Sequence, residues 1–308
     1  MKTTEAVINK WPSILPMLGV GEHFLTGKHT SCPICSTGKD RFRFDNKEGR
    51  GTYFCNSCGA GDGWKLLKLV CGWEFREAAD KVDSVIGNAR VSTPVKVDDE
   101  AKRRARLKKI ASRVRPIESS PVSEYLINRG ISGEVIKRIS NKLGFVEGLN
   151  YWQDSKRFGT YQAMTALVEN EDEPATYHIT YLENGSKAKV GHCRKIMPPV
   201  KPITGGAVQL FESKHTLGIA EGIETAIAAT QLFDVPTWAA INASNLESFI
   251  VPDGVTELYI FGDNDANYVG QNAAYSLAKR ASQRGLDVTT HIPQKANTDW
   301  NDVLLEKR

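Results

Sequence analysis

The sequence of 308 residues contains no apolar run approaching the roughly 20 residues that a membrane-spanning helix needs. Its N-terminus, MKTTEAVINKWPSILPML, lacks the charged-then-apolar layout of a secretory signal. Internal repeats and low-complexity blocks are also missing. These absences argue against a membrane or secreted protein and favour a soluble, cytoplasmic one. The composition, 41% hydrophobic and 25% charged, is typical of globular domains, and the length allows two or three of them.

Cysteine is scarce, and four of the six cysteines lie in two pairs. Cys32-x2-Cys35 and Cys55-x2-Cys58 are separated by nineteen residues. In a chain without an export signal, this spacing indicates metal rather than disulfides, and four thiolates suit one tetrahedral, structural Zn²⁺. His29 lies nearby, but four cysteines already fill the coordination shell.

The stretch between the pairs, KDRFRFD, alternates basic and aromatic residues. In a strand, Arg41 and Arg43 lie on one face, whereas Phe42 and Phe44 lie on the other. The phenylalanines then pack inward, and the outer face offers charges and rings to unstacked bases, unless it is only the surface of a small hydrophobic core. The residues predicted to bind DNA are Arg41, Arg43, Arg50, Tyr53 and Trp64.

Charge is unevenly distributed. Residues 1–90 carry a net charge of +3, residues 91–205 +7 and residues 206–308 −6. A basic front and middle joined to an acidic end fits phosphate binding by the former and metal binding by the latter, although an uneven solvated surface would show the same trend.

The pattern along the chain predicts a mixed α/β protein with four segments. Residues 1–86 hold the cysteine pairs and a helical stretch over 64–82; residues 87–105 are a polar linker and the start of a basic helix that runs over 100–115. Residues 106–210 form an α+β subdomain, with helices after Pro121 and Ser132 and strands over 160–169 and 175–185.

Residues 211–308 alternate strands and helices, which predicts a mainly parallel sheet covered by helices. The strands are expected at 216–220, 236–241, 257–262 and 287–292, and the helices at 223–233, 245–250 and 270–284.

Three acidic motifs follow strands of this last segment. Glu221 comes after LGIA, Asp263 and Asp265 come after LYIFG, and Asp299 comes after DVTTHI. The carboxyl ends of parallel strands share one edge of the sheet, so the motifs should converge. Each motif alone could instead be a helix or turn cap. Together they indicate Mg²⁺ or Mn²⁺, since these ions prefer oxygen ligands and stabilise the charge of phosphoryl transfer.

The acidic segment resembles the Toprim domain of primases, topoisomerases and some nucleases, in which a glutamate follows one strand and Asp-x-Asp follows a later one. The motif IAEGIETAIAA looks like the Toprim domain of phage and mobile-element primases. SCPICSTGKDRFRF and GTYFCNSCGAGDGW are similar to the zinc module of phage primase-helicases, and SEYLINRGIS resembles a helix of the primase core. The resemblance implies a DNA primase that makes short oligonucleotides from nucleoside triphosphates on single-stranded DNA in a bacterial host cell.

The resemblance also implies roles for particular residues. Asp263 and Asp265 hold divalent metal, Asp299 assists, and Glu221 holds metal or accepts the proton of the attacking 3′-hydroxyl. Residues of the basic piece before the acidic segment, which could equally be an exposed loop, are candidates for triphosphate or template contacts: Arg194, Lys195 and Lys201.

The sequence contains no GxxxxGK[ST] phosphate loop, so we expect any helicase partner to be a separate protein. Two alternatives stay open. A Toprim nuclease uses the same carboxylates but degrades DNA without nucleotides. A non-catalytic adaptor binds single-stranded DNA and needs no carboxylates.

Overall fold

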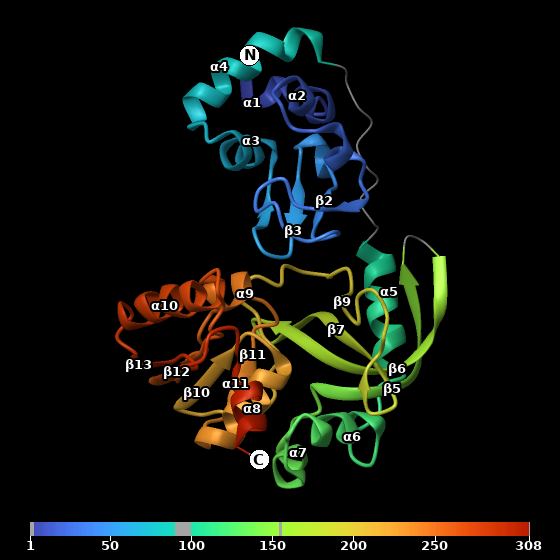
Figure 1. Ribbon diagram of the computed structural model, residues 1–308, viewed down its shortest axis with the longest axis vertical. Helices are drawn as coiled ribbons and strands as arrows, with labels where there is room; N and C mark the ends of the chain where they lie inside the picture. The colour runs from blue at the N-terminus through green and yellow to red at the C-terminus, as the bar shows by residue number, and fades with distance from the viewer. Residues whose placement is uncertain (1–2, 90–99, 154–155, 308) are drawn as a thin grey trace. The chain divides into compact units, whose positions relative to one another are not determined.

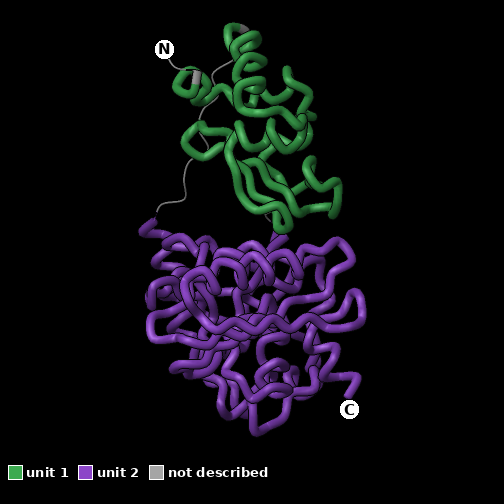
Figure 2. Tube along the Cα trace, turned by 90° about the vertical axis from the view of Figure 1, so that its left-hand side faces the viewer, with its two compact units in different colours: residues 1–99 green, residues 100–308 purple. Residues whose placement is uncertain are grey.

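The computed structural model describes residues 3–89, 100–153 and 156–307 (Figure 1). The chain folds into two compact units, Met1–Asp99 and Glu100–Arg308 (Figure 2). Most of the segment predicted as a linker lies outside the described residues. Among the helices that are described, none combines the length and the apolar character needed to cross a membrane.

Unit 1 is built on a four-stranded antiparallel sheet of order β1-β2-β3-β4. The strands are β1 (His29–Thr30), β2 (Phe42–Phe44), β3 (Tyr53–Cys55) and β4 (Gly59–Gly61). The helices are α1 (Thr3–Ala6), α2 (Trp11–Met17), α3 (Gly63–Cys71) and α4 (Phe75–Val85), with short 3-10 turns η1 (Glu22–Leu25), η2 (Lys47–Gly49) and η3 (Ile86–Asn88).

The helical stretch predicted over 64–82 consists of two helices, α3 and α4, with a break between them. Helix α3 is capped at its N-terminus by Asp62, whose carboxylate accepts a hydrogen bond from the backbone N–H of Lys65 at 3.0 Å. It ends at Gly72, which adopts a left-handed backbone (φ +72°) that favours glycine, and α4 then starts in a new direction. Apolar residues keep roughly helical spacing on both sides of Gly72. The sequence pattern therefore gives no sign that one helix ends there and another begins.

Unit 2 contains an antiparallel sheet of order β5-β6-β7-β8, with β9 also paired to β7. Its strands are β5 (Leu143–Gln153), β6 (Lys156–Asn170), β7 (Glu173–Glu183), β8 (Ser186–Lys187) and β9 (Arg194–Ile196); the helices before it are α5 (Glu100–Ala111), α6 (Pro121–Asn128) and α7 (Gly133–Arg138). Strands β6 and β7 and helices α5 to α7 correspond to predicted elements. Strand β5 was not predicted, since its register shifts between Val146 and Leu149 interrupt the alternation that signals a strand.

The rest of unit 2 is an α/β layer around a parallel sheet of order β11-β10-β12-β13, as the alternating pattern predicts. The strands are β10 (Thr216–Ala220), β11 (Thr237–Ala239), β12 (Glu257–Phe261) and β13 (Asp287–His291). The helices are α8 (Ile223–Phe233), α9 (Ala243–Ser248), α10 (Val269–Ser282) and α11 (Trp300–Glu306).

Alternating side chains of the parallel strands enter two different cores. Leu217 and Ile219 of β10 pack with residues of α9 and α10, whereas Ala220 packs with α8 and α11. Figure 1 shows these helix pairs on the two faces of the sheet. The α8 side continues into the core beneath α6, α7 and the antiparallel sheet, where Tyr125 and Met164 are also buried. The parallel and antiparallel sheets of unit 2 therefore share one core, which fixes their side chains relative to each other.

Candidate functional site

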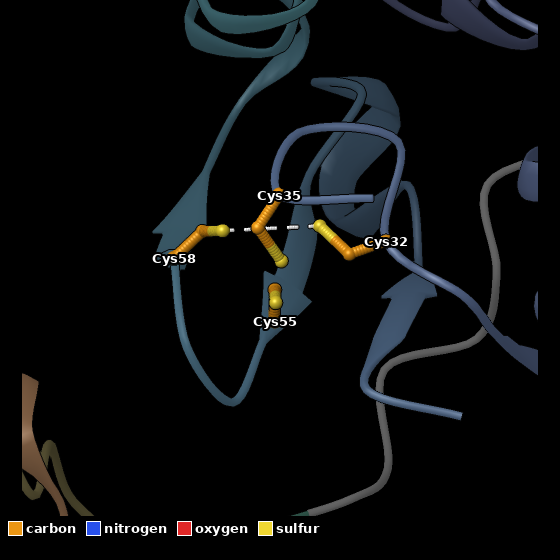
Figure 3. Close-up of side chains that lie close together, drawn as sticks. All are labelled: Cys32, Cys35, Cys55 and Cys58. Atoms are coloured by element: carbon orange, nitrogen blue, oxygen red, sulfur yellow. Dashed lines mark hydrogen bonds between the residues drawn. The ribbon is translucent and has the colours of Figure 1, made fainter. Parts of the chain in front are cut away.

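A cysteine cluster lies at one end of the unit 1 sheet (Figure 3). The sulfurs of Cys32, Cys35, Cys55 and Cys58 all lie within 4.8 Å of one another, and the sulfurs of Cys32 and Cys58 are 3.8 Å apart. Among the described residues, no other set of three or more His, Cys, Asp or Glu side chains gathers its ligand atoms this closely. His29 is not part of the cluster, and its Nδ1 lies 3.0 Å from the carbonyl oxygen of Asp40.

The chemistry of the four sulfurs fits one structural zinc ion. Burial raises the pKa of Cys32 to about 11, and burial with the neighbouring sulfurs raises the pKa of Cys58 well above its usual range. Four thiolates so close together need a cation, and Zn²⁺ is the usual one. Backbone N–H groups of Ile34 and Ser57 donate to the sulfurs of Cys32 and Cys55, each at 3.4 Å, and so orient them.

The exposed face of the four-stranded sheet of unit 1 carries a different aromatic residue from the one predicted. Arg41 and Arg43 are exposed and Phe42 is buried, as the alternation requires. Tyr53, however, is only 2% exposed and stacks on Phe42, so the prediction that its ring meets bases is wrong. Phe54 is 44% exposed and lies directly opposite Arg43 across the strand pair. The register of β3 thus places Phe54, not Tyr53, beside the arginine.

The other two residues predicted to bind DNA differ in exposure. Arg50 is exposed, and its guanidinium lies 3.9 Å from the Glu48 carboxylate. Trp64 is half-buried, because its ring packs edge-on against Trp11, with 5.0 Å between the ring centres, and at a tilt against Phe75, with 5.2 Å between the ring centres. Trp64 therefore contributes to the core of unit 1 and exposes only part of its ring.

Unit 2 contains an acidic cavity of about 210 Å³ at the carboxyl edge of the parallel strands. Glu221 follows β10, Asp263 follows β12, and Asp299 lies at the start of α11 after β13. These three carboxylates line the cavity, so strands of a parallel sheet bring them together as predicted. Ile241 also lines it and holds a left-handed backbone (φ +69°), a strained state for a β-branched residue of the kind found at functional sites.

Glu221 and Asp263 are electrostatically unfavourable in the absence of a cation. Burial raises the pKa of Asp263 to about 8, and repulsion from Glu221 and Asp299 adds to it. Burial and repulsion from Asp265 raise the pKa of Glu221 to about 7. The Oδ1 atom of Asp263 is buried and has no hydrogen-bond partner within the described part of the chain. An orphaned carboxylate oxygen of this kind suits a bound cation.

The other predicted carboxylates also hold local structure. One oxygen of Asp299 caps α11 by accepting from the backbone N–H groups of Asn301 (2.7 Å) and Asp302 (2.9 Å). Its other oxygen accepts from the hydroxyl of Thr225 at 3.2 Å. Asp265 accepts from the backbone N–H of Gly270 at 3.0 Å and does not line the cavity itself. The alternative of a capping role thus holds for Asp299 and in part for Asp265, but not for Asp263.

The predicted basic residues separate into one that reaches the cavity and two that do not. Arg194 of β9 lines it and lowers the pKa of Glu221 by its charge. Lys195, the next residue, points to the opposite side of the strand, where its ammonium lies 4.1 Å from the ring centre of Tyr151. Lys201 forms an ion pair with Glu173 at 2.6 Å. The structure therefore brings only Arg194 of this set to the acidic residues.

Two cations that line the cavity were not predicted. Arg129 follows α6, and its buried Nε has no hydrogen-bond partner among the described residues. Lys187 of β8 forms an ion pair at 3.0 Å with Glu224, another cavity residue. Arg129 lies within the primase-like motif SEYLINRGIS, which was a usable signal. Lys187 lies in no motif, since its position depends on the pairing of β8 with β7.

The donor set of the cavity fits a divalent cation that keeps part of its water shell. Glu221 and Asp263 offer oxygens inside the cavity, and Asp265 interacts with Glu221 from beside it. These oxygens are less tightly gathered than the four sulfurs, as is common for Mg²⁺, which binds through one or two carboxylates, waters and substrate phosphates. The cavity therefore suits a divalent cation that prefers oxygen ligands.

Comparison with known families identifies both ends of the chain. Residues 216–308 match the Toprim domain, and residues 27–64 match the zinc-binding domain of primase-helicase. Residues 101–210 match a domain of unknown function (DUF7146). The recognition of a primase-type zinc ribbon and a Toprim domain in one chain is confirmed, as is the mixed α/β fold with a parallel C-terminal sheet.

Solved structures of bacterial primases also align with the chain. The zinc-binding and RNA polymerase domains of the Aquifex aeolicus primase share 14% identity with a TM-score of 0.45, covering 99% of this chain and 82% of that one. A DNA primase domain from Pseudomonas aeruginosa shares 15% identity with a TM-score of 0.43, covering 67% and 75%. At such identities and TM-scores, the likeness carries no functional argument.

We predict that bound zinc stabilises the fold of unit 1 and that loss of the zinc leaves the fold of unit 2 unchanged. We expect Cys58→Ser to lose the bound zinc and to abolish amide hydrogen-exchange protection in residues 27–64, because folding of such a ribbon depends on the metal. Protection in residues 216–308 should stay unchanged. Zinc content by atomic emission and exchange by mass spectrometry measure both. Cys71→Ser, outside the cluster, is the matched control; retention of zinc by Cys58→Ser would contradict the assignment.

Replacing Asp263 should stabilise the metal-free protein, and more so at higher pH. The native Asp263 keeps its proton up to about pH 8, whereas the unfolded chain loses it near pH 4. The native state therefore binds more protons in this window, and the contribution of Asp263 to stability falls as pH rises from 4 to 8. We expect Asp263→Asn to unfold at a higher temperature than wild type at pH 8, with the gap narrowing towards pH 5.

Adding Mg²⁺ should reverse this order at pH 8, because the ion stabilises only the chain that retains the carboxylate. Thermal unfolding of both proteins without added divalent ions and then with Mg²⁺ provides the comparison. A variant that is less stable than wild type in metal-free buffer at pH 8 would show that Asp263 is satisfied without a cation.

Proposed function

We propose that this chain, which joins a primase-type zinc ribbon to a Toprim domain, is a DNA primase that makes short primers from nucleoside triphosphates on single-stranded DNA. The observation that carries the proposal is the cavity in unit 2. Its lining combines Glu221 and Asp263, one oxygen of which has no hydrogen-bond partner among the described residues, with three cations, Arg129, Lys187 and Arg194. A site with this charge pattern fits a metal-bound triphosphate.

The carboxylates would hold the cation. Asp263 and Asp265 are the proposed Mg²⁺ or Mn²⁺ ligands, and Glu221 either joins them or accepts the proton of the attacking 3′-hydroxyl. Asp299 assists mainly by placing α11 and by adding negative charge, since its oxygens already accept hydrogen bonds. The bound ion supplies charge neutralisation at the phosphate oxygens.

The cations would bind the triphosphate and orient it. Arg129 and Arg194 offer planar guanidinium groups that match phosphate oxygens, and Lys187 offers a compact ammonium. They come from the residue after α6 and from β8 and β9, outside the Toprim match, so both parts of unit 2 contribute to the proposed site. Lys195 and Lys201 do not line this cavity and are proposed to contact the template instead.

The ribbon would contact the template through its outer face. Arg41, Arg43 and Arg50 are proposed phosphate contacts, and Phe54 is proposed to stack on a base. The half-buried Trp64 is a further proposed contact. A separate helicase in the cytoplasm of a bacterial host would supply the single strand.

Primer synthesis tests the proposal directly. We expect labelled nucleotides to be incorporated into short oligonucleotides on random single-stranded templates with Mg²⁺, and Asp263→Asn to lower the rate at least about a hundredfold. Asp287→Asn, at the opposite end of the same sheet, is the matched control and should retain activity. Degradation of the template without nucleotides would indicate the nuclease instead. Binding without synthesis, insensitive to Asp263→Asn, would indicate the adaptor.

Template binding should depend on Phe54 and not on the hydroxyl of Tyr53. We expect Phe54→Ala to weaken binding of a labelled single strand by about tenfold, since stacking on one base contributes about 1–3 kcal/mol. Tyr53→Phe should bind like wild type, because the buried hydroxyl faces no base. Fluorescence anisotropy at fixed salt measures both; equal affinities of Phe54→Ala and wild type would remove Phe54 from the interface.

A further inference from the structure

Glu224 is a buried carboxylate that the proposed chemistry does not use. It lies three residues after Glu221, in the first turn of α8, and is 5% exposed. Its Oε1 accepts a hydrogen bond from the hydroxyl of Tyr125 at 2.5 Å and forms the ion pair with Lys187 at 3.0 Å. Burial alone would raise the pKa of Glu224, but the Lys187 ammonium and the Tyr125 bond lower it to about 2. Glu224 is therefore an ionised group inside the protein.

Stability alone is a weak reason for such a group. Removing two charges from water costs several kcal/mol per ion, and a buried ion pair often adds no net stability over apolar residues of similar size. The neighbours of Glu224 in α8 are buried apolar residues such as Ala226 and Ile227, which an apolar side chain at this position would extend. We therefore ask which side chain the ion pair fixes in place.

What Glu224 positions is the end of a long, flexible side chain. Lys187 lies on the two-residue strand β8, just after the turn at Asn184 and Gly185. The side-chain amide of Asn128 donates to the carbonyl of Gly185 at 2.9 Å and so holds this turn against α6. Glu224 then binds the ammonium from the helix that starts next to Glu221. Strand β8, α6 and α8 together fix the ammonium in the wall of the cavity.

The cavity is also lined by carboxylates that would compete for the same ammonium if it left Glu224. Glu221, Asp263 and Asp299 line it together with Lys187, and two of them have raised pKa values that a nearby cation would relieve. A lysine free to turn would pair with them and oppose a divalent ion. Glu224 offers the lysine a carboxylate of its own. An ammonium has three donors, so the bond to Glu224 leaves capacity for a phosphate oxygen.

We propose that Glu224 is a positioning residue that holds Lys187 away from the metal-binding carboxylates and presents its ammonium to the phosphates of the incoming nucleotide. The identity of the phosphate ligand rests on the proposed function. The ion pair that fixes Lys187, and the effect of that ion pair on metal binding, do not depend on the proposed function.

The test measures Mn²⁺ binding by electron paramagnetic resonance, without nucleotide or DNA. We expect Glu224→Gln to weaken Mn²⁺ binding about tenfold, because the released lysine competes for the carboxylates. The double variant Glu224→Gln with Lys187→Met should bind Mn²⁺ as wild type does, since the competitor is gone. Its KM for nucleoside triphosphate should rise several-fold with little change in kcat, because a ground-state phosphate contact is lost.

A second buried ion pair in unit 2 provides the matched control. Glu169 is 5% exposed and pairs with Lys142 at 2.5 Å, and neither residue lines the cavity. Glu169→Gln should destabilise the fold comparably and leave Mn²⁺ affinity unchanged. A merely structural role for Glu224 predicts the same behaviour for both variants, so equal Mn²⁺ affinities of Glu224→Gln and Glu169→Gln would overturn the proposal.

Two further outcomes are decisive. If Glu224→Gln does not fold, Glu224→Asp, which keeps the charge on a shorter side chain, is compared with Glu169→Asp. Weaker Mn²⁺ binding in Glu224→Asp alone supports the positioning role, and equal Mn²⁺ affinities overturn it. If wild type makes no primers but Mn²⁺ binding weakens in Glu224→Gln and recovers in the double variant, the proposed function fails while the hold on Lys187 stands.

Discussion

The repulsion between Glu221 and Asp263 is the constraint on which the site of this protein depends. Parallel strands β10 and β12 are neighbours in register, with Ala220 opposite Phe261, so the residues that follow them emerge together. Burial then prevents water from screening the two charges. Two carboxylates placed this way hold protons until a cation joins them, and a buried pair that favours a cation is what metal-dependent phosphoryl transfer needs.

The shared core of unit 2 brings cationic side chains to this acidic edge of the parallel sheet. The face of the parallel sheet that packs on α8 is continuous with the core under α6, α7 and the antiparallel sheet. Because of this continuity, Arg129, Lys187 and Arg194 reach the carboxylates from outside the Toprim segment. Acidic ligands and cationic side chains therefore come from different parts of the chain, and packing rather than sequence proximity joins them.

Local patterns predicted the parts of the fold that depend on local physics. Strand β10 and helix α8 lie at the predicted residues, because apolar runs and helical periodicity are continuous there. Tyr53 and Phe54 show where such patterns fail: both are aromatic, and only the register of β3 against β2 decides which one is buried. Lys187 was missed for the same reason, since nothing around it in sequence indicates that Glu224 lies beside it. The acidic motifs could be predicted from the sequence because strand ends are local signals. The positions of the cations that line the same cavity depend on tertiary structure.

A crystal structure with Mn²⁺ and a non-hydrolysable nucleoside triphosphate would test the central claim most directly. We expect an anomalous Mn²⁺ peak bound by Asp263, with Glu221 or Asp265 as a further ligand. We also expect phosphates against Arg129, Lys187 and Arg194. Mn²⁺ and phosphates bound elsewhere, with Asp263 still without a cation, would contradict it.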